Sequence, residues 1–368
     1  MKVLMVSKAC VVGTYQTKLE AIGRTPDVDL TVVVPPYWKE PGGDLMLEHS
    51  HTQHYTLRVE QIRLNGRYHF HYYPKLGPLI ETLQPDIVHL DEEPYSFVTL
   101  HGLRHAKAVG AKALFFSWQN ISRRYVAPFR MVEQYVLGSA DYALMGNAAA
   151  DAVWRGKGYS GPSQILPQFG VSLDLFEPKS HESRPNTPFV IGSASRRLKY
   201  EKGVDLLMHA AARLSGNWCL KITGDGGERP ELEQLTRRLG IEDRVQFIGK
   251  IGSDAMRSFL HSLDVMVLPS RTMPTWKEQF GRVLIESMAS EVPVVGSDSG
   301  EIPNVIGDAG FVFPEGDADA LFKHLDALQR SETLRLEFGR KGRQRVVSHY
   351  TQEQIAAKTV AVYRTMLQ

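Results

Sequence analysis

Two carboxylates, Glu278 and Glu286, stand eight positions apart on either side of a Phe-Gly step and an apolar run. The apolar run predicts a helix that contains Glu286, with Glu278 on the loop before it. A loop that enters a helix through Phe280-Gly281 presents free backbone N–H groups at the positive end of a helix dipole, which suits a phosphate. An ionised carboxylate only accepts hydrogen bonds, so it suits the vicinal hydroxyls of a sugar. Together these features indicate a nucleotide-sugar as the ligand.

Cationic side chains lie on a basic loop after a predicted strand at 189–195. Arg197 and Lys202 stand on this loop, before a helix that begins after Gly203. The two cations can approach one diphosphate from either side of the loop. Scattered charge on a solvated loop is the alternative interpretation. At the end of the next strand, Gly224 permits a tight turn near a ligand, although an ordinary strand-to-helix turn explains it equally well.

These motifs resemble those of retaining GT-B-type glycosyltransferases of family four, the glycosyl transferases group 1. The glutamate pair is similar to the family's E-x7-E motif, and the basic loop resembles its R-L-x-x-E-K-G element. Arg196 stands where the family usually has Gly, a small departure. The resemblance implies catalytic roles for three residues, with the first two holding the donor pyrophosphate and the third near the donor sugar: Arg197, Lys202 and Glu278. It further implies donor contacts, including one to the ribose hydroxyls from the second glutamate, at Gly224, Gln279, Phe280, Gly281, Arg282, Val283 and Glu286.

The first half of the chain resembles the family more weakly. Gly13 lies where a strand gives way to a helix, so backbone there can approach a phosphate or a reacting sugar. The family often has a donor-sugar His after the strand predicted at 112–118, but Gln119 and Asn120 follow it here. Their amides can bond a sugar hydroxyl but cannot act as acid or base. No general base is identified in this half, so the leaving phosphate is expected to take the acceptor's proton.

Short apolar runs alternate with helical patterns, which predicts parallel strands joined by crossover helices. The pattern restarts after a Pro- and Gly-rich stretch at 167–188. We therefore expect an α/β chain of two doubly wound Rossmann-like domains facing across a cleft. The expected domains are an acceptor-binding domain at 1–172, a nucleotide-sugar-binding domain at 173–350, and a helix at 351–368 that packs back on the first domain.

Composition limits the class of protein. The chain has 368 residues and a formal charge of +2, with Lys and Arg exceeding Asp and Glu by one on each side of residue 175, so neither half has the basic excess of a nucleic-acid binder. Its two cysteines, Cys10 and Cys219, exclude a disulfide framework and fit a reducing cytoplasm. We expect no signal peptide and no transmembrane helix, and a cytoplasmic location that extends to the inner face of the membrane.

The segment 37–73 is the least regular part of the chain. It contains five histidines, including His49, His51 and His54, and a strand-like run at 68–72. A metal site is one interpretation. A surface excursion that faces the acceptor is the preferred one, because no cysteine accompanies the histidines and their spacing would need an unusual ligand geometry. The D-x-D sequences at 27–29 and 317–319 are interpreted as the start of a strand and the cap of a helix, not as metal sites. The family resemblance implies that Arg and Lys neutralise the phosphate, so we expect a metal-independent enzyme.

The predicted function is transfer of a sugar, most simply a hexose, with retention from a nucleoside-diphosphate sugar to a glycan, lipid-linked or small-molecule acceptor. A UDP-sugar is favoured over a GDP-sugar. The main alternative is a non-catalytic relic that only holds nucleotide. A nicotinamide oxidoreductase would need a glycine fingerprint that Gly13 alone does not supply. The basic and aromatic residues 123–125 and 129–130 suggest peripheral membrane contact, with a solvated helix face as the preferred alternative.

Overall fold

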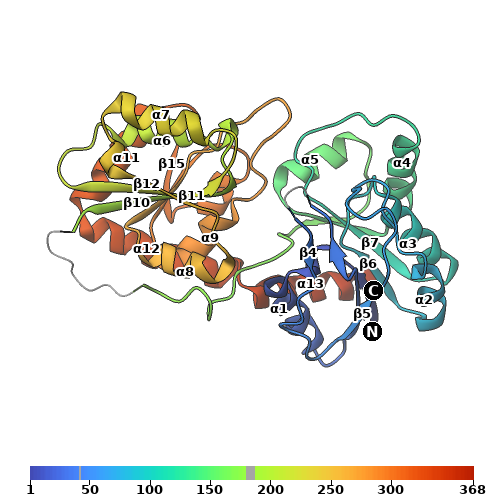
Figure 1. Cartoon of the computed structure of the whole chain (residues 1–368). Coiled ribbons are helices and arrows are strands. Elements are labelled where there is room, and N and C mark those ends of the chain that lie inside the picture. Colours follow the sequence, from blue (N-terminus) through green and yellow to red (C-terminus); the bar gives the residue numbers. More distant parts are fainter. Residues whose placement is uncertain (41–42, 180–186) are drawn as a thin grey trace. The chain divides into compact units, whose positions relative to one another are not determined.

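The computed structural model describes residues 1–40, 43–179 and 187–368. The chain forms two compact units, one made of Met1–Ser172 with Gln352–Gln368 and the other of Leu173–Thr351. Each unit is a parallel sheet with helices on both faces (Figure 1). The predicted α/β class with two Rossmann-like halves is therefore confirmed.

The sheet of the first unit has seven parallel strands in the order β5-β2-β1-β6-β7-β8-β9. The chain fills one edge first and then returns to fill the other, so the strand order reverses between β1 and β6. In open α/β sheets, ligands bind beyond the carboxyl ends of the strands at such a reversal. The strands are β1 (Lys2–Val6), β2 (Asp29–Val34), β5 (Thr56–Val59), β6 (Ile87–Leu90), β7 (Lys112–Ser117), β8 (Tyr142–Met145) and β9 (Ser163–Ile165).

Helices cover both faces of this sheet because successive strand residues point to opposite sides. Leu4 and Val6 pack in one buried cluster, and Val3 and Met5 pack in the other. The first face is covered by α2 (Leu76–Leu83), α3 (Phe97–Ala108), α4 (Phe129–Ser139) and α5 (Ala148–Gly156); the second by α1 (Gly13–Gly23) and α13 (Gln352–Leu367). The last helix is thus part of the first unit.

The sheet of the second unit repeats this plan with six parallel strands in the order β12-β11-β10-β13-β14-β15. The order reverses between β10 and β13, which marks the corresponding ligand position. The strands are β10 (Phe189–Arg197), β11 (Trp218–Asp225), β12 (Val245–Gly249), β13 (Val265–Leu268), β14 (Val294–Ser297) and β15 (Gly310–Phe313).

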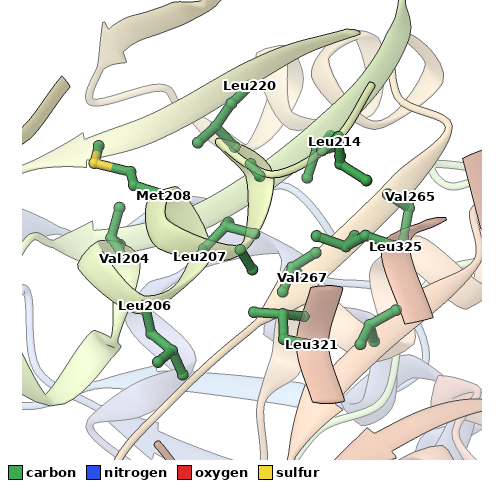
Figure 2. Packing of buried hydrophobic residues seen from close by; sticks show 14 of the residues in the cluster. Val204, Leu206, Leu207, Met208, Leu214, Leu220, Val265, Val267, Leu321 and Leu325 are labelled. Atoms are coloured by element: carbon green, nitrogen blue, oxygen red, sulfur yellow. The ribbon is translucent and has the colours of Figure 1, made fainter. Parts of the chain in front are cut away.

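The core of the second unit lies between this sheet and three helices, α6 (Val204–Ala211), α7 (Arg229–Leu239) and α11 (Ala318–Arg330). Leu207 of α6 and Leu325 of α11 are fully buried among the strand residues Val265 and Val267 (Figure 2). Elsewhere in the unit lie α8 (Ser253–His261), α9 (Arg282–Ala289), α10 (Ile302–Ile306) and α12 (Glu332–His349), of which α9 packs on α12. The core therefore fixes where the ends of β10 and β13 lie.

Two predicted elements differ in the structure. The helical pattern of residues 123–137 predicts one helix, but α4 begins only at Phe129. Pro128 precedes it, and a proline fits at the start of a helix but not in its interior, because it lacks an N–H and its ring clashes with the preceding turn. The strand-like run at 68–72 forms turns instead, with a single bridge between Arg63 and Tyr72. The described part of the excursion contains only the two-residue pair β3 (Tyr37–Trp38) and β4 (Leu45–Met46) and the edge strand β5.

Candidate functional site

The Phe-Gly step lies immediately before α9, as the sequence predicts. Gly281 adopts a left-handed conformation, with φ of 77°, and α9 begins at the next residue, Arg282. A side chain at Gly281 would be strained in that conformation and would press on Leu268. Within the described residues, no side chain caps the first turn of α9. The amino end of this helix therefore has the backbone geometry that an anion needs.

Lys202 and Glu278 lie together at the reversal point of the second sheet. Lys202 ends a 3-10 turn, η2 (Tyr200–Lys202), and its Nζ lies 3.0 Å from Glu278 Oε2. The same carboxylate oxygen accepts a hydrogen bond from Ser270 Oγ at 3.1 Å, just after β13. The Lys202 ammonium also lies 4.3 Å from the ring centre of Trp276. Two of the predicted catalytic residues are thus brought together by elements far apart in the sequence.

Arg197 is the last residue of β10, although the sequence predicted that the strand ends at Ser195. The strand continues because its pairing with β11 resumes after a bulge, with Arg197 opposite Asp225. The Arg197 side chain is exposed. Gly224 lies inside β11, and a Cβ there would overlap the carbonyl oxygen of Ser195. Close backbone packing therefore accounts for the glycine at 224, and its donor contact stays a prediction.

Glu286 lies on the body of α9 and is 9% exposed. Its Oε1 accepts a hydrogen bond from Arg282 Nε at 2.8 Å, one helical turn away. Burial raises the pKa of Glu286, and the neighbouring Arg282 opposes that shift. Among the remaining predicted donor contacts, Phe280 is buried, Val283 is half-buried and Gln279 is exposed. The structure thus places these residues around the start of α9, and their donor contacts stay predictions.

In the first unit, Gly13 begins α1, and its N–H donates to Glu48 Oε2 at 2.6 Å. A carboxylate of the chain itself thus bonds the backbone that was expected to face a phosphate or sugar. Gln119 and Asn120 follow β7, and both are buried. Gln119 Oε1 accepts a hydrogen bond from the Tyr125 hydroxyl at 2.7 Å.

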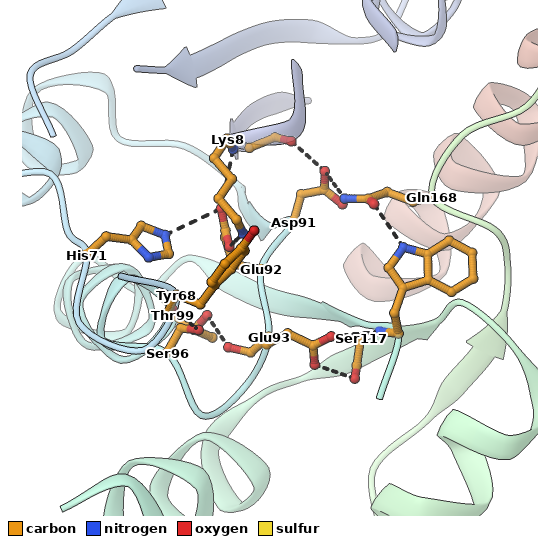
Figure 3. Close-up of polar contacts among 12 residues, drawn as sticks. Lys8, Tyr68, His71, Asp91, Glu92, Glu93, Ser96, Thr99, Ser117 and Gln168 are labelled. Atoms are coloured by element: carbon orange, nitrogen blue, oxygen red, sulfur yellow. Dashed lines mark hydrogen bonds and ion pairs between the residues drawn. The ribbon is translucent and has the colours of Figure 1, made fainter. Parts of the chain in front are cut away.

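Sequence reasoning missed a cluster of acids directly after β6, at the reversal point of the first sheet (Figure 3). Asp91 accepts hydrogen bonds from Ser7 Oγ at 2.6 Å and from Gln168 Nε2 at 2.9 Å. Glu92 is buried and forms an ion pair with the partly buried Lys8. The signal in the sequence was three consecutive acids at the carboxyl end of a buried strand.

The three acids ionise differently. Burial raises the pKa of Asp91. Burial also raises the pKa of Glu92, but Lys8 and then His71 outweigh it and hold the pKa at about 2. Burial raises the pKa of Glu93 to about 7. The first half therefore contains a partly exposed carboxylate, Glu93, whose pKa burial raises, and the expectation that the leaving phosphate takes the proton stays a prediction.

The described residues contain no group of three or more His, Cys, Asp or Glu side chains arranged to hold a metal ion. His49, His51 and His54 accordingly form no such group. Asp317 caps α11 by accepting hydrogen bonds from the N–H groups of Asp319 and Ala320, as its position predicted. No helix in the described part of the chain has the length and hydrophobicity needed to span a bilayer.

Comparison with known proteins relates this chain to glycosyltransferases. The family of glycosyl transferases group 1 matches residues 176–345. The chain is 36% identical over 150 residues to the N-acetyl-alpha-D-glucosaminyl L-malate synthase of Bacillus anthracis, which is 40% of this chain and 38% of that protein. It is 28% identical over 269 residues to the MMP alpha-(1->4)-mannosyltransferase of Mycolicibacterium hassiacum, which is 72% of this chain and 63% of that protein. The chain thus spans less than two thirds of these two relatives.

Solved structures share the fold over nearly the whole chain. Sucrose-phosphate synthase from Thermosynechococcus elongatus superposes with a TM-score of 0.75 at 19% identity, covering 100% of this chain and 99% of that one. Anabaena HepE in complex with UDP superposes with a TM-score of 0.74 at 18% identity, covering 99% of this chain and 100% of that one. The fold is the GT-B fold. The match to the family of glycosyl transferases group 1 lies within the second unit of the chain.

Proposed function

We propose that the chain transfers a hexose from a nucleoside-diphosphate sugar to a hydroxyl of a glycan, lipid-linked or small-molecule acceptor, with retention at the anomeric carbon. The observation that carries this proposal is the Lys202–Glu278 pair, 3.0 Å apart, at the end of the sheet where the strand order reverses. Reversal points of open α/β sheets bind ligands, and uncapped helix ends bind phosphates.

The reaction builds negative charge on the leaving diphosphate, and cationic groups of the second unit are suited to stabilise that charge. The bond between the anomeric carbon and the diphosphate oxygen breaks, and its electron pair leaves with the diphosphate. Lys202, Arg197 and the amino end of α9 stabilise that negative charge, which is the main term in such transfers. The acceptor oxygen bonds to the anomeric carbon on the same face, and its proton passes to the leaving phosphate. Because Lys202 and Ser270 already hydrogen-bond Glu278, we prefer this route to one in which Glu278 acts as the nucleophile.

A UDP-sugar is the preferred donor. HepE, which has the same fold, is bound to UDP in one solved structure and to UDP-glucose in another. Glu286 would accept hydrogen bonds from the ribose hydroxyls, since its carboxylate lies on the first turns of α9. Arg197 and Lys202 neutralise the diphosphate in this scheme, so the transfer is proposed to be metal-independent. Membrane contact through the exposed Arg123, Arg124 and Arg130 stays a prediction.

Binding of UDP is expected to raise the melting temperature of the second unit. At a UDP concentration of a hundred times Kd, the gain of about 2.7 kcal/mol corresponds to roughly 5–10 °C. Glu286→Ala should abolish this rise, because the ribose hydroxyls lose their acceptor. Differential scanning fluorimetry with UDP, GDP and ADP, each with and without its sugar, measures the effect and identifies the donor.

A matched control is available on α7. Glu233 pairs with Arg229 one turn away at 2.8 Å, as Glu286 pairs with Arg282. Glu233→Ala should keep the full rise with UDP. An unchanged rise in Glu286→Ala would contradict the ribose contact, and no rise with any nucleotide would contradict the proposed donor site. Release of nucleotide from a donor sugar, with and without acceptor, separates an active enzyme from a binding relic.

A further inference from the structure

An open cavity of about 660 Å³ lies in the first unit, and none of its lining residues has a role in the proposed transfer. Its walls come from α3, from the end of α2 and from the turns at 64–72. Most of the lining side chains are apolar, among them Leu64, Phe70, Tyr72, Phe97 and Leu100. A cavity of this size with apolar and aromatic walls is typical of a site that buries an apolar ligand.

One of these residues, Leu64, has a strained backbone. Its φ is 54°, in the left-handed region, and the residue is 48% exposed at the cavity. Bulky residues rarely adopt this region, whereas glycine adopts it without steric cost. Folding alone does not require an exposed leucine at such a position. Because strained residues cluster at ligand sites, this one indicates a ligand that the leucine side chain contacts.

The charged groups of the cavity lie on the last turns of α3 and at the end of α2. Arg104 is exposed, and its guanidinium has no hydrogen bond or ion pair with any residue that the structure describes. The neighbouring His105 lies 3.4 Å from the Glu81 carboxylate, so these two side chains offset each other when the histidine is protonated. The cavity thus combines apolar walls with one uncompensated guanidinium, a group that suits a phosphate or carboxylate.

The surface around the cavity has an excess of positive charge. The helix α3 packs against both α2 and α4, and all three cover the same face of the sheet (Figure 1). Among the described residues 61–83, 97–108 and 121–139 of this face, eight Lys and Arg residues are exposed against one exposed Asp or Glu. The whole chain has a formal charge of only +2, so this face is distinctly basic. The ring of Phe70 lies 4.8 Å from that of Phe129, so the cavity adjoins the start of α4.

We propose that this face docks on an anionic membrane surface, with one lipid acyl chain in the cavity and the lipid phosphate on Arg104. Leu64 and Phe70 contact the chain, and the guanidinium donates to the phosphate oxygens. Peripheral binding that lasts needs two signals, buried apolar area and basic charge, and this face offers both.

The lipid bound here is a docking ligand and not the sugar acceptor. Acceptors are expected beyond the carboxyl ends of the strands, where α3 begins at Phe97. Arg104 lies about 10 Å further along this helix, at 1.5 Å per residue. The inference therefore does not depend on the proposed sugar transfer, and its experiments use neither nucleotide nor sugar.

Co-sedimentation with vesicles tests the surface. The wild type should pellet with vesicles of phosphatidylglycerol and phosphatidylcholine and stay in solution with phosphatidylcholine alone. Arg104→Ala should weaken the binding about fivefold at low salt, because each cation near an anionic surface contributes roughly that factor. Arg237→Ala is the matched control, since Arg237 is also exposed and lines a cavity of about 650 Å³ on α7 whose other lining residues are mainly polar. This control should bind like the wild type.

Leu64→Gly separates a lipid site from a structural role. Glycine accepts the left-handed backbone, so the variant should melt within about 2 °C of the wild type. It should nevertheless bind the anionic vesicles about tenfold more weakly, because it loses apolar contact with the chain. Gln84→Gly is the matched control: Gln84 ends α2 with a similar φ of 47°, is exposed and lies outside the lining of the cavity. It should match the wild type in both measurements.

Dodecyl phosphate, a soluble single-chain amphiphile, tests the cavity itself. Below its critical micelle concentration it should bind the wild type at one site in titration calorimetry, and Leu64→Gly and Arg104→Ala should each weaken that binding. A wild type that does not pellet with anionic vesicles would overturn the inference, as would full vesicle binding by both variants. Vesicle binding without dodecyl phosphate binding would overturn the role of the cavity, since charge alone would then hold the face on the membrane. Binding of dodecyl phosphate without vesicle binding would overturn the membrane as the source of the lipid.

Discussion

Replacing Lys202 by alanine is expected to lower kcat/KM for sugar transfer by about 10²–10³-fold. Lys202 lies at the reversal point of the second sheet, and its ammonium is held by Glu278 at 3.0 Å and by the face of Trp276. A fixed positive charge beside a leaving diphosphate stabilises the transition state without reorganisation, and losing one such group costs roughly 3–4 kcal/mol. Steady-state kinetics with the donor identified by the UDP binding experiment measure the loss.

The neighbouring Lys199 provides the matched control. It lies just before η2 and pairs with Glu201 at 3.5 Å, with its side chain 54% exposed. Surface pairs contribute little, so Lys199→Ala should stay within about twofold of the wild type. Retention of most activity by Lys202→Ala would contradict the proposed role.

A double-mutant cycle separates the two ways in which Lys202 can act. If Lys202 only holds Glu278 in place, the double variant should transfer sugar at the same rate as Glu278→Gln alone. If Lys202 acts directly on the diphosphate, the double variant should be slower than either single variant. The account predicts the second result.

Gly203→Ala is expected to lower the free energy of unfolding of the second unit by about 2–5 kcal/mol. Gly203 adopts a left-handed conformation, with φ of 66° and ψ of 21°, between η2 and α6. The conformation alone costs an L-residue roughly 1–2 kcal/mol. A Cβ would also overlap the carbonyl oxygen of Pro269, and forced displacement in packed regions costs about 1–3 kcal/mol more. Urea unfolding, followed by circular dichroism, measures the change.

Gly240 isolates the steric part of this effect. It ends α7 with a similar φ of 65°, and nothing lies within 4 Å of a Cβ placed there. Gly240→Ala should therefore lose only the conformational part, about 1–2 kcal/mol. Equal losses in the two variants would contradict the close approach of Pro269. Gly203→Ala should also weaken UDP binding, because Lys202 immediately precedes the displaced residue.

The sequence predicted the sheets well because buried parallel strands leave a local signal. The short run from Val245 to Gly249, for example, predicts a strand with the bounds that the structure shows. The Phe280-Gly281 step before the helix was equally readable, since glycine adopts a left-handed conformation without the steric cost that other residues have. Boundaries set by tertiary pairing were not readable, as β10 shows: its extension to Arg197 depends on Asp225 of the neighbouring strand.

The three consecutive acids after β6 show the same limit of sequence-based prediction. Asp91, Glu92 and Glu93 are consecutive, and nothing in that run distinguishes them. They differ because of distant residues: Lys8 pairs with Glu92, and Ser117 and the Trp118 N–H bond Glu93. The pairing of Lys202 with Glu278, 76 positions apart, was not predicted; the family resemblance only assigned both residues to the donor site. Local patterns therefore predict the elements, and the packing of those elements assigns the chemistry of each side chain.

The most direct test of the central claim is a crystal structure of the protein with UDP bound. The account predicts that the diphosphate lies against Lys202 and Arg197 and accepts hydrogen bonds from the first N–H groups of α9, with the ribose hydroxyls on Glu286. Density for the diphosphate at any other place would contradict the assignment of the donor site.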